Sequence, residues 1–122
     1  PTEFNTEATF NVANLRFAME RARLLSNATQ NGTVKLEFKN GVVSSHVHSP
    51  EVGRVNEEID TSAVSGEDLS ISFNPTYLID ALKAIESEKV VIRFISAVRP
   101  FTLVPAEESE RFIQLITPVR TN

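Results

Sequence analysis

Two stretches of the chain, 63 residues apart, carry the same residue pattern. Phe10-Asn11-Val12 corresponds to Phe73-Asn74-Pro75, and the apolar positions that follow recur at the same spacing. Those positions are Leu15, Ala18 and Met19 in the first copy and Leu78, Ala81 and Leu82 in the second. In each copy a short apolar strand leads into a helical pattern, with Asn11 or Asn74 placed as the N-cap. The pattern predicts one domain, residues 1–122, built from an internal repeat of residues 8–60 and 69–117.

Each helical pattern is followed by three stretches with strand character. We expect helices at residues 13–25 and 75–85, each with one apolar and one polar face. The expected strands are residues 9–12, 34–39, 42–48 and 52–60 in the first half and 69–73, 89–95, 100–104 and 111–117 in the second, with 61–68 as the link. Asn40-Gly41 marks a tight hairpin. The order βαβββ, twice, predicts an α+β fold with two helices on one face of a mainly antiparallel sheet of about eight strands.

The composition limits the classes of protein to which the chain can belong. With 41% hydrophobic and 23% charged residues it matches an ordinary folded domain, and its apolar runs are too short to span a membrane. It has no cysteine and needs no oxidising compartment, so we expect a cytoplasmic protein. The net charge of −4 argues against a uniformly basic surface for nucleic acid. Because the chain begins at Pro1, we expect it to be an excerpt from a longer polypeptide.

His46-Val47-His48 is the sharpest cluster of residues with metal-binding or catalytic chemistry. Strand alternation points both imidazoles to one face, but a carboxylate such as Glu51 or Glu58 would have to complete a metal site. One alternative is therefore a small β-rich metal-dependent enzyme that uses His46 and His48, and the competing interpretation is a solvated strand face. The scattered glycines form no phosphate-binding loop, and no Ser-His-Asp positioning motif is present. We expect no catalytic residue, metal or cofactor.

The first helix is locally basic although the whole chain is acidic. Arg16, Arg21 and Arg23 stand against the single Glu20. Such a helix could meet phosphate groups through mobile, non-specific contacts. A solvated helix face with a Glu-Arg pair is the competing interpretation.

The C-terminal segment, residues 115–122, is a short apolar strand that stops at a proline. Pro118 ends the strand and leaves Val119 and Arg120 near the end of the chain. Side chains in this position could line a groove rather than fill a core.

Four segments together resemble the third, C-terminal domain of the bacterial sliding clamp, the β subunit of DNA polymerase III. They are residues 21–27, 73–82, 98–101 and 115–120. Their order and spacing cover nearly the whole chain, and the duplicated βαβββ unit is the internal repeat expected of a clamp domain. The resemblance implies the DNA-clamp fold and a processivity factor without catalytic activity, in which two three-domain chains form a ring around double-stranded DNA.

The resemblance also implies partners and sites. The DNA polymerase III α subunit, the clamp loader and repair polymerases would bind through short peptides of the Gln-x-x-Leu-Phe kind, in a pocket shared with the second domain. By motif, the peptide-binding residues are Asn74, Tyr77, Val98, Pro100, Leu115, Ile116, Thr117, Pro118, Val119 and Arg120. The subunit-interface residues are Arg21, Leu24 and Leu25, and the DNA-facing residues are Arg16 and Arg23. Core packing is the competing interpretation for Leu25, Leu115 and Ile116, and an unrelated α+β adaptor domain is the remaining alternative.

Overall fold

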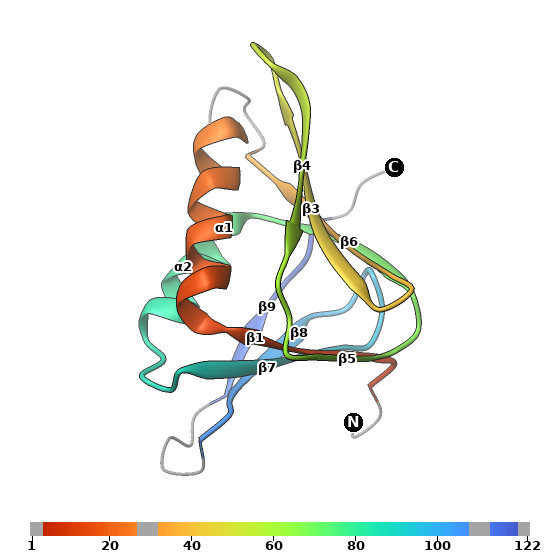
Figure 1. Cartoon of the computed structure of the whole chain (residues 1–122), viewed down its shortest axis with the longest axis vertical. Helices are drawn as coiled ribbons and strands as arrows, with labels where there is room; N and C mark the ends of the chain where they lie inside the picture. Colours follow the sequence, from red (N-terminus) through yellow and green to blue (C-terminus); the bar gives the residue numbers. More distant parts are fainter. Residues whose placement is uncertain (1–3, 27–31, 108–112, 120–122) are drawn as a thin grey trace.

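The computed structural model describes residues 4–26, 32–107 and 113–119. Within these ranges the chain forms two helices and nine strands (Figure 1). In chain order they are β1 (Thr6–Asn11), α1 (Val12–Ser26), β2 (Val34–Lys39), β3 (Val42–Ser49), β4 (Gly53–Ile59), β5 (Ala63–Gly66), β6 (Leu69–Phe73), α2 (Pro75–Lys83), β7 (Lys89–Phe94), β8 (Phe101–Pro105) and β9 (Gln114–Ile116). Neither helix is long and apolar enough to cross a membrane, as far as the described residues go.

The strands pair antiparallel and belong to two sheets. One sheet has five strands in the order β5-β1-β7-β8-β9, and the other has four in the order β4-β3-β2-β6. The α+β class with mainly antiparallel strands is confirmed. The structure differs from the expected arrangement in two respects: the strands divide between two sheets, and part of the expected link forms β5. β5 pairs antiparallel with β1. This pairing covers an edge of β1 that would otherwise have unpaired backbone groups.

Each half of the chain contributes its first strand to the sheet of the other half. β1 pairs with β7, and β6 pairs with β2. The three strands after each helix, β2-β3-β4 and β7-β8-β9, pair consecutively as meanders. Because of this exchange, neither half can complete its sheet without the other.

The two junctions between strand and helix follow the signals in the sequence. Asn74 Oδ1 accepts the N–H of Thr76 at 2.9 Å and caps α2, and Pro75 occupies the first helical turn. Asn11 Oδ1 accepts the N–H of Asn14 at 2.9 Å at the start of α1. Both expected caps are confirmed.

Two turns depend on positive φ angles. Asn40 and Gly41 have φ of 53° and 78°, which the expected two-residue hairpin between β2 and β3 requires. Gly66, at the end of β5, has a φ of 98°. A Cβ atom at Gly66 would collide with the carbonyl oxygen of Asn5, so only glycine fits where β5 meets the start of β1.

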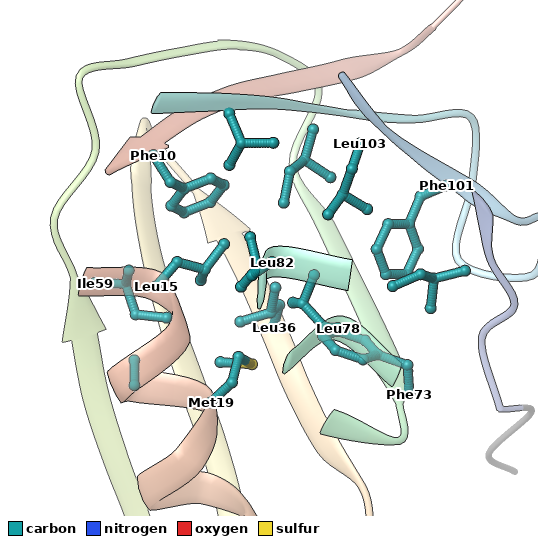
Figure 2. Packing of buried hydrophobic residues seen from close by; sticks show 14 of the residues in the cluster. Phe10, Leu15, Met19, Leu36, Ile59, Phe73, Leu78, Leu82, Phe101 and Leu103 are labelled. Carbon is teal, nitrogen blue, oxygen red and sulfur yellow. The ribbon is translucent and has the colours of Figure 1, made fainter. Parts of the chain in front are cut away.

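The core lies where the two helices meet the inner faces of the sheets (Figure 2). α1 contributes Leu15 and Met19 to it, and α2 contributes Leu78 and Leu82, all fully buried. These are positions that the repeat predicted for the apolar faces of the helices. Residues of both helices and of both sheets contribute to this one core cluster.

Four phenylalanines join the inner faces of the two sheets. Phe38 lies 4.8 Å from Phe94, Phe94 lies 5.0 Å from Phe101, and Phe101 lies 5.2 Å from Phe73, measured between ring centroids. Phe38 and Phe73 belong to the four-stranded sheet, and Phe94 and Phe101 to the five-stranded one. The contact between the two sheets buries this aromatic surface.

Candidate functional site

An apolar surface lies where α2 meets the last strand, β9. Tyr77 on α2 is 62% exposed, and Leu115 on β9 is 68% exposed. Both line a pocket of about 510 Å³, together with Ile116 and Thr117. We call it the α2–β9 pocket. It therefore brings together four of the residues that the resemblance assigned to peptide binding.

The cap and core face of α2 set the position of Tyr77. Tyr77 comes three residues after the capping Asn74, and its N–H donates to the Asn74 carbonyl oxygen at 3.2 Å. Leu78 and Leu82 hold the opposite face of the helix in the core, which directs Tyr77 outward. The Oδ1 atom of Asn74 is used by the cap, whereas its Nδ2 amide makes no hydrogen bond with the described residues.

Strand alternation on β9 directs the side chains of Leu115 and Ile116 to opposite faces. Ile116 is 4% exposed and pairs in register with Phe101 of β8, so it lies at the base of the pocket, next to the core. Leu115 points the other way and is exposed. The core interpretation is thus confirmed for Ile116 and wrong for Leu115. Gln114 Nε2 donates to the carbonyl oxygen of Ala81 at 3.4 Å and ties β9 to α2.

The loop between β7 and β8 supplies two more of the assigned residues. Val98 is exposed, and its N–H donates to Ser96 Oγ at 3.3 Å. Pro100 is exposed and immediately precedes Phe101, the register partner of Ile116. Pro100 and Thr117 therefore leave the same end of the β8–β9 pair.

The segment after β9 runs along the other sheet. The N–H of Val119 donates to the carbonyl oxygen of Ser72 on β6 at 2.8 Å. This bond leaves Pro118 half-buried and Val119 exposed. Arg120, the last assigned residue, lies outside the described residues.

Sequence reasoning missed several residues of this surface. Asp80, Ala81 and Gln114 also line the pocket, and Ile113 is exposed just before β9. Helical spacing from Tyr77 could have found Asp80 and Ala81, which follow it at i+3 and i+4. Chemically, the pocket combines the apolar side chains of Leu115 and Ile116 and the ring of Tyr77 with polar side chains, an arrangement suited to an apolar side chain held by directional hydrogen bonds. The polar side chains are those of Asp80, Gln114 and Thr117.

A second surface lies on α1. Leu24 is 74% exposed, whereas Leu25 is partly buried and packs against the core. Arg21 makes a two-pronged contact with Glu57 of β4, and its Nε donates to Glu57 Oε1 at 3.1 Å. This hydrogen bond is the main reason why the pKa of Arg21 is raised above its ordinary value. The Arg21 side chain is thereby held against the edge strand β4 beside the exposed Leu24.

The helix arginines carry less free charge than the sequence of α1 suggests. Arg16 Nη1 lies 3.7 Å from Glu20 Oε2, and its guanidinium lies 5.1 Å from the centre of the exposed Phe17 ring. Arg21 is paired with a carboxylate as well. Of the three arginines, Arg23 alone makes no ion pair with the described residues. The partner of Arg21 could not be seen in the helix sequence because it comes from β4.

The comparison with protein families decides what kind of domain this is. The family model described as "DNA polymerase III beta subunit, C-terminal domain" matches residues 1–120. The chain belongs to this family. The resemblance inferred from the sequence and the expected DNA-clamp fold are thereby confirmed.

Sliding clamps from streptococci are similar to the chain in both sequence and structure. The beta sliding clamp of Streptococcus pneumoniae is 80% identical over 122 residues, which are 100% of this chain and 32% of that protein. A crystal structure of the DNA polymerase III beta chain from S. pneumoniae matches with a TM-score of 0.95 at 79% identity, covering 99% of this chain and 32% of that one. The beta subunit from Streptococcus pyogenes matches with a TM-score of 0.94 at 67% identity, covering 99% and 33%. The chain is a sliding-clamp domain and spans about a third of the length of these relatives.

In this clamp domain His46 and His48 do lie on one face of β3. Both side chains alternate with the buried Ser45 and Val47. His46 Nε2 lies 2.9 Å from Ser44 Oγ and 3.5 Å from a Glu37 carboxylate oxygen. Over residues 4–26, 32–107 and 113–119, no three His, Cys, Asp or Glu side chains come together as metal ligands. Membership of the clamp family replaces the metal-dependent enzyme and the unrelated adaptor as interpretations of the chain.

Proposed function

We propose that this chain is the C-terminal domain of a three-domain processivity factor. It is a single clamp domain, residues 1–122, with an internal repeat of residues 8–60 and 69–117. In the whole protein, two such chains would close head to tail into a ring around double-stranded DNA in the cytoplasm. The observation that carries this proposal is the 80% identity, over the full length of the chain, to a beta sliding clamp.

The domain would act by holding other proteins near DNA, without catalysing a reaction. A ring linked topologically to DNA raises the effective concentration of a bound polymerase at its template, so processivity does not require tight binding to DNA. The ion pairs of Arg16 with Glu20 and of Arg21 with Glu57 leave α1 with little free charge. A surface of this kind would contact phosphates weakly and let the ring slide, with Arg16 and Arg23 facing the DNA.

The α2–β9 pocket would hold the hydrophobic end of a short linear peptide. A leucine or phenylalanine side chain of the peptide would lie between Tyr77 and Leu115 and above Ile116, and burying it would contribute roughly 1.5–3 kcal/mol. The unpartnered Nδ2 of Asn74 would donate to a peptide carbonyl oxygen. The remaining assigned residues, Val98, Pro100, Thr117, Pro118, Val119 and Arg120, would extend this surface toward the second domain.

Several partners would share this one pocket. The DNA polymerase III α subunit, the clamp loader and repair polymerases would each present a peptide of the Gln-x-x-Leu-Phe kind. Because the same apolar pocket accepts each peptide, these partners would bind in competition.

Arg21, Leu24 and Leu25 would form the contact with the partner subunit. Leu24 on α1 is 74% exposed, so its side chain contributes little to the core of this chain and is available for a contact with another subunit. Glu57 holds the Arg21 guanidinium in place next to it. Covering Leu24 in the ring would remove this apolar surface from water.

The test is a titration of the isotope-labelled chain with a Gln-Leu-x-Leu-Phe peptide, followed by amide NMR. We expect shifts confined to the neighbourhood of Asn74, Tyr77, Val98 and residues 115–119. Tyr77→Ala should weaken binding about tenfold or more, because it removes a wall of the pocket. Phe17→Ala is the matched control, since Phe17 is an exposed aromatic residue on the other helix and lies outside the pocket.

Three results would contradict the peptide proposal. A scrambled peptide that produced the same shifts would show that the binding is non-specific. Equal losses of affinity in Tyr77→Ala and Phe17→Ala would show that the α2–β9 pocket is not the site. If no shifts occur, a chain extended at its N-terminus to include the second domain should restore them, and failure there would reject the pocket.

A further inference from the structure

The outer face of the four-stranded sheet carries a hollow that the proposed clamp function does not use. The hollow has a volume of about 550 Å³ and lies over all four strands, β2, β3, β4 and β6. Its charged and ionisable lining residues are Lys35, His46, His48 and Arg54. We call it the sheet hollow.

Nearly every residue of the sheet hollow can donate a hydrogen bond. Asn56, Ser72 and Thr33 complete its polar lining, so seven of the eight lining residues have donor side chains and Val47 is the exception. Among the described residues that line the hollow there is no aspartate or glutamate, although the chain has 16 acidic residues against 12 basic ones. A donor-rich lining without carboxylates is complementary to an anion.

The strand register places each cation of the sheet hollow beside an imidazole, which gives two centres. Lys35 is paired with His46, and Arg54 is paired with His48. His46 and His48 are two residues apart on β3, so the two centres lie about 7 Å apart along the strand. Ser72 and Asn56 flank the first centre in the same cross-strand row, on β6 and β4.

On this face, Glu37 and Glu58 lie next to the Lys35–His46 centre, on the side away from the Arg54–His48 centre. Glu37 is paired with Ser44, and Ser44 is paired with Glu58, which forms a separate cross-strand row. Glu37 and Ser44 both contact His46 Nε2, so this carboxylate has a partner already. The face is therefore divided along the strands into an acidic row and the positive sheet hollow.

The two cations of the sheet hollow are not neutralised by the protein. Neither Lys35 nor Arg54 forms an ion pair with a described residue, whereas Arg16, Arg21 and Arg93 each pair with a glutamate. Other lysines and arginines on the surface are unpaired too, but each of these two lies directly beside an imidazole. An anion could contact Lys35 and Arg54 without displacing an ion pair of either side chain.

We propose that the sheet hollow binds a ligand with linked phosphate groups. The two cations, Lys35 on β2 and Arg54 on β4, are offset by about 7 Å along the strands and about 10 Å across them, a spacing that suits a chain of phosphates better than a single phosphate ion. The hydroxyl and amide donors around them match the many acceptor oxygens of such a chain. β2 and β3 are inner strands whose backbone groups are already paired, so an acidic peptide lying across them would gain no main-chain hydrogen bonds from these two strands.

Linked phosphates can come from inorganic polyphosphate or from a nucleoside triphosphate. Within the part of the chain that the structure describes, the lining of the sheet hollow contains no Phe, Tyr or Trp ring on which a base could stack. The phosphate chain would therefore supply most of the binding, and a nucleoside would add little. Inorganic triphosphate and dATP separate the two sources.

The test is a titration of the isotope-labelled chain with sodium triphosphate in a phosphate-free buffer of low ionic strength. We expect amide shifts at Lys35, His46, His48 and Arg54. Lys35→Gln and Arg54→Gln should each weaken binding roughly tenfold, because each removes a charge-assisted hydrogen bond. Lys39→Gln is the matched control, because Lys39 is exposed on the same face of β2 but lies beyond Glu37. It should leave the affinity unchanged within about twofold.

Four outcomes decide the proposal. Weaker binding of monophosphate than of triphosphate, and equal binding of triphosphate and dATP, would support it. Equal losses of triphosphate affinity in Lys35→Gln and Lys39→Gln would show that general surface charge causes the binding, and would overturn the proposal. Binding of a glutamate-rich peptide at the same residues, without binding of triphosphate, would make the site a protein contact and would also overturn it. Because the α2–β9 pocket is not involved, the peptide titration can succeed or fail independently of this one.

Discussion

The two βα units of this domain are alike in their cores and different at their surfaces. Leu15 of α1 and Leu78 of α2 are counterparts at the offset of 63 residues, and both are fully buried. The exposed position just before each of them is Asn14 in the first unit and Tyr77 in the second. The buried positions therefore hold the fold common to the two units, while the exposed positions are free to serve different surfaces.

The lengths of the helices add to this difference. α1 has 15 residues and α2 has nine, so the last turns of α1 have no helical counterpart in the second unit. Leu24, the residue proposed for the subunit contact, belongs to this extra part. Both proposed protein contacts thus arise where the repeat is broken: at Tyr77 by a different side chain and at Leu24 by a longer helix.

The largest effect is expected from shortening the two buried leucines. Leu15→Ala and Leu78→Ala should each lower the free energy of unfolding by about 3 kcal/mol, because each removes buried methyl groups and leaves a cavity. Urea denaturation of the two variants measures this directly. Leu24→Ala is the control and should change stability by less than about 0.5 kcal/mol, since its side chain is exposed. If one buried leucine cost only a third of the other, the units would not be equivalent in the core.

The repeat made much of the fold predictable. Helical spacing of Leu15, Met19, Leu78 and Leu82 gave both helices and their buried faces, and alternation in residues 34–39 gave a strand with one face in the core. The division into two sheets was not predictable, because it depends on which strands pair. That choice is set by long-range contacts such as those among the phenylalanines at the sheet interface, which no local pattern contains.

The surface sites were less predictable than the fold. Strand alternation could say that one of Leu115 and Ile116 is buried, but only the register with Phe101 shows that it is Ile116. The sheet hollow is built from four strands, and its two positive centres exist only because Lys35 lies opposite His46 and Arg54 opposite His48. Pairing of this kind is fixed by the fold and leaves no signal in a single stretch of sequence.

A smaller effect is expected at β5, the strand that has no counterpart in the repeat. Gly66→Ala should lower the free energy of unfolding by about 2 kcal/mol, because its φ is positive and a Cβ atom would meet the Asn5 carbonyl oxygen. Gly53→Ala is the matched control: its φ is also positive, but nothing lies within 4 Å of the new Cβ atom, so it should cost only about 1 kcal/mol. Hydrogen exchange should show faster exchange in β5 and the start of β1 for Gly66→Ala alone. Equal costs for the two variants would mean that the close approach of β5 to β1 does not matter.

The smallest effect on stability separates the structural role of a cap from its role at a surface. Asn11→Ala and Asn74→Ala should each cost about 1 kcal/mol in thermal or urea unfolding, because each removes the side-chain acceptor at the start of a helix. Only Asn74→Ala should also weaken binding of the Gln-Leu-x-Leu-Phe peptide, since Asn74 lies three residues before Tyr77 and its Nδ2 makes no hydrogen bond with the described residues. Asn74→Asp isolates that second role, because it keeps an oxygen for the cap and removes the amide donor. We expect Asn74→Asp to have normal stability and to bind the peptide more weakly. Full peptide affinity in this variant would show that Asn74, like Asn11, acts only as a helix cap.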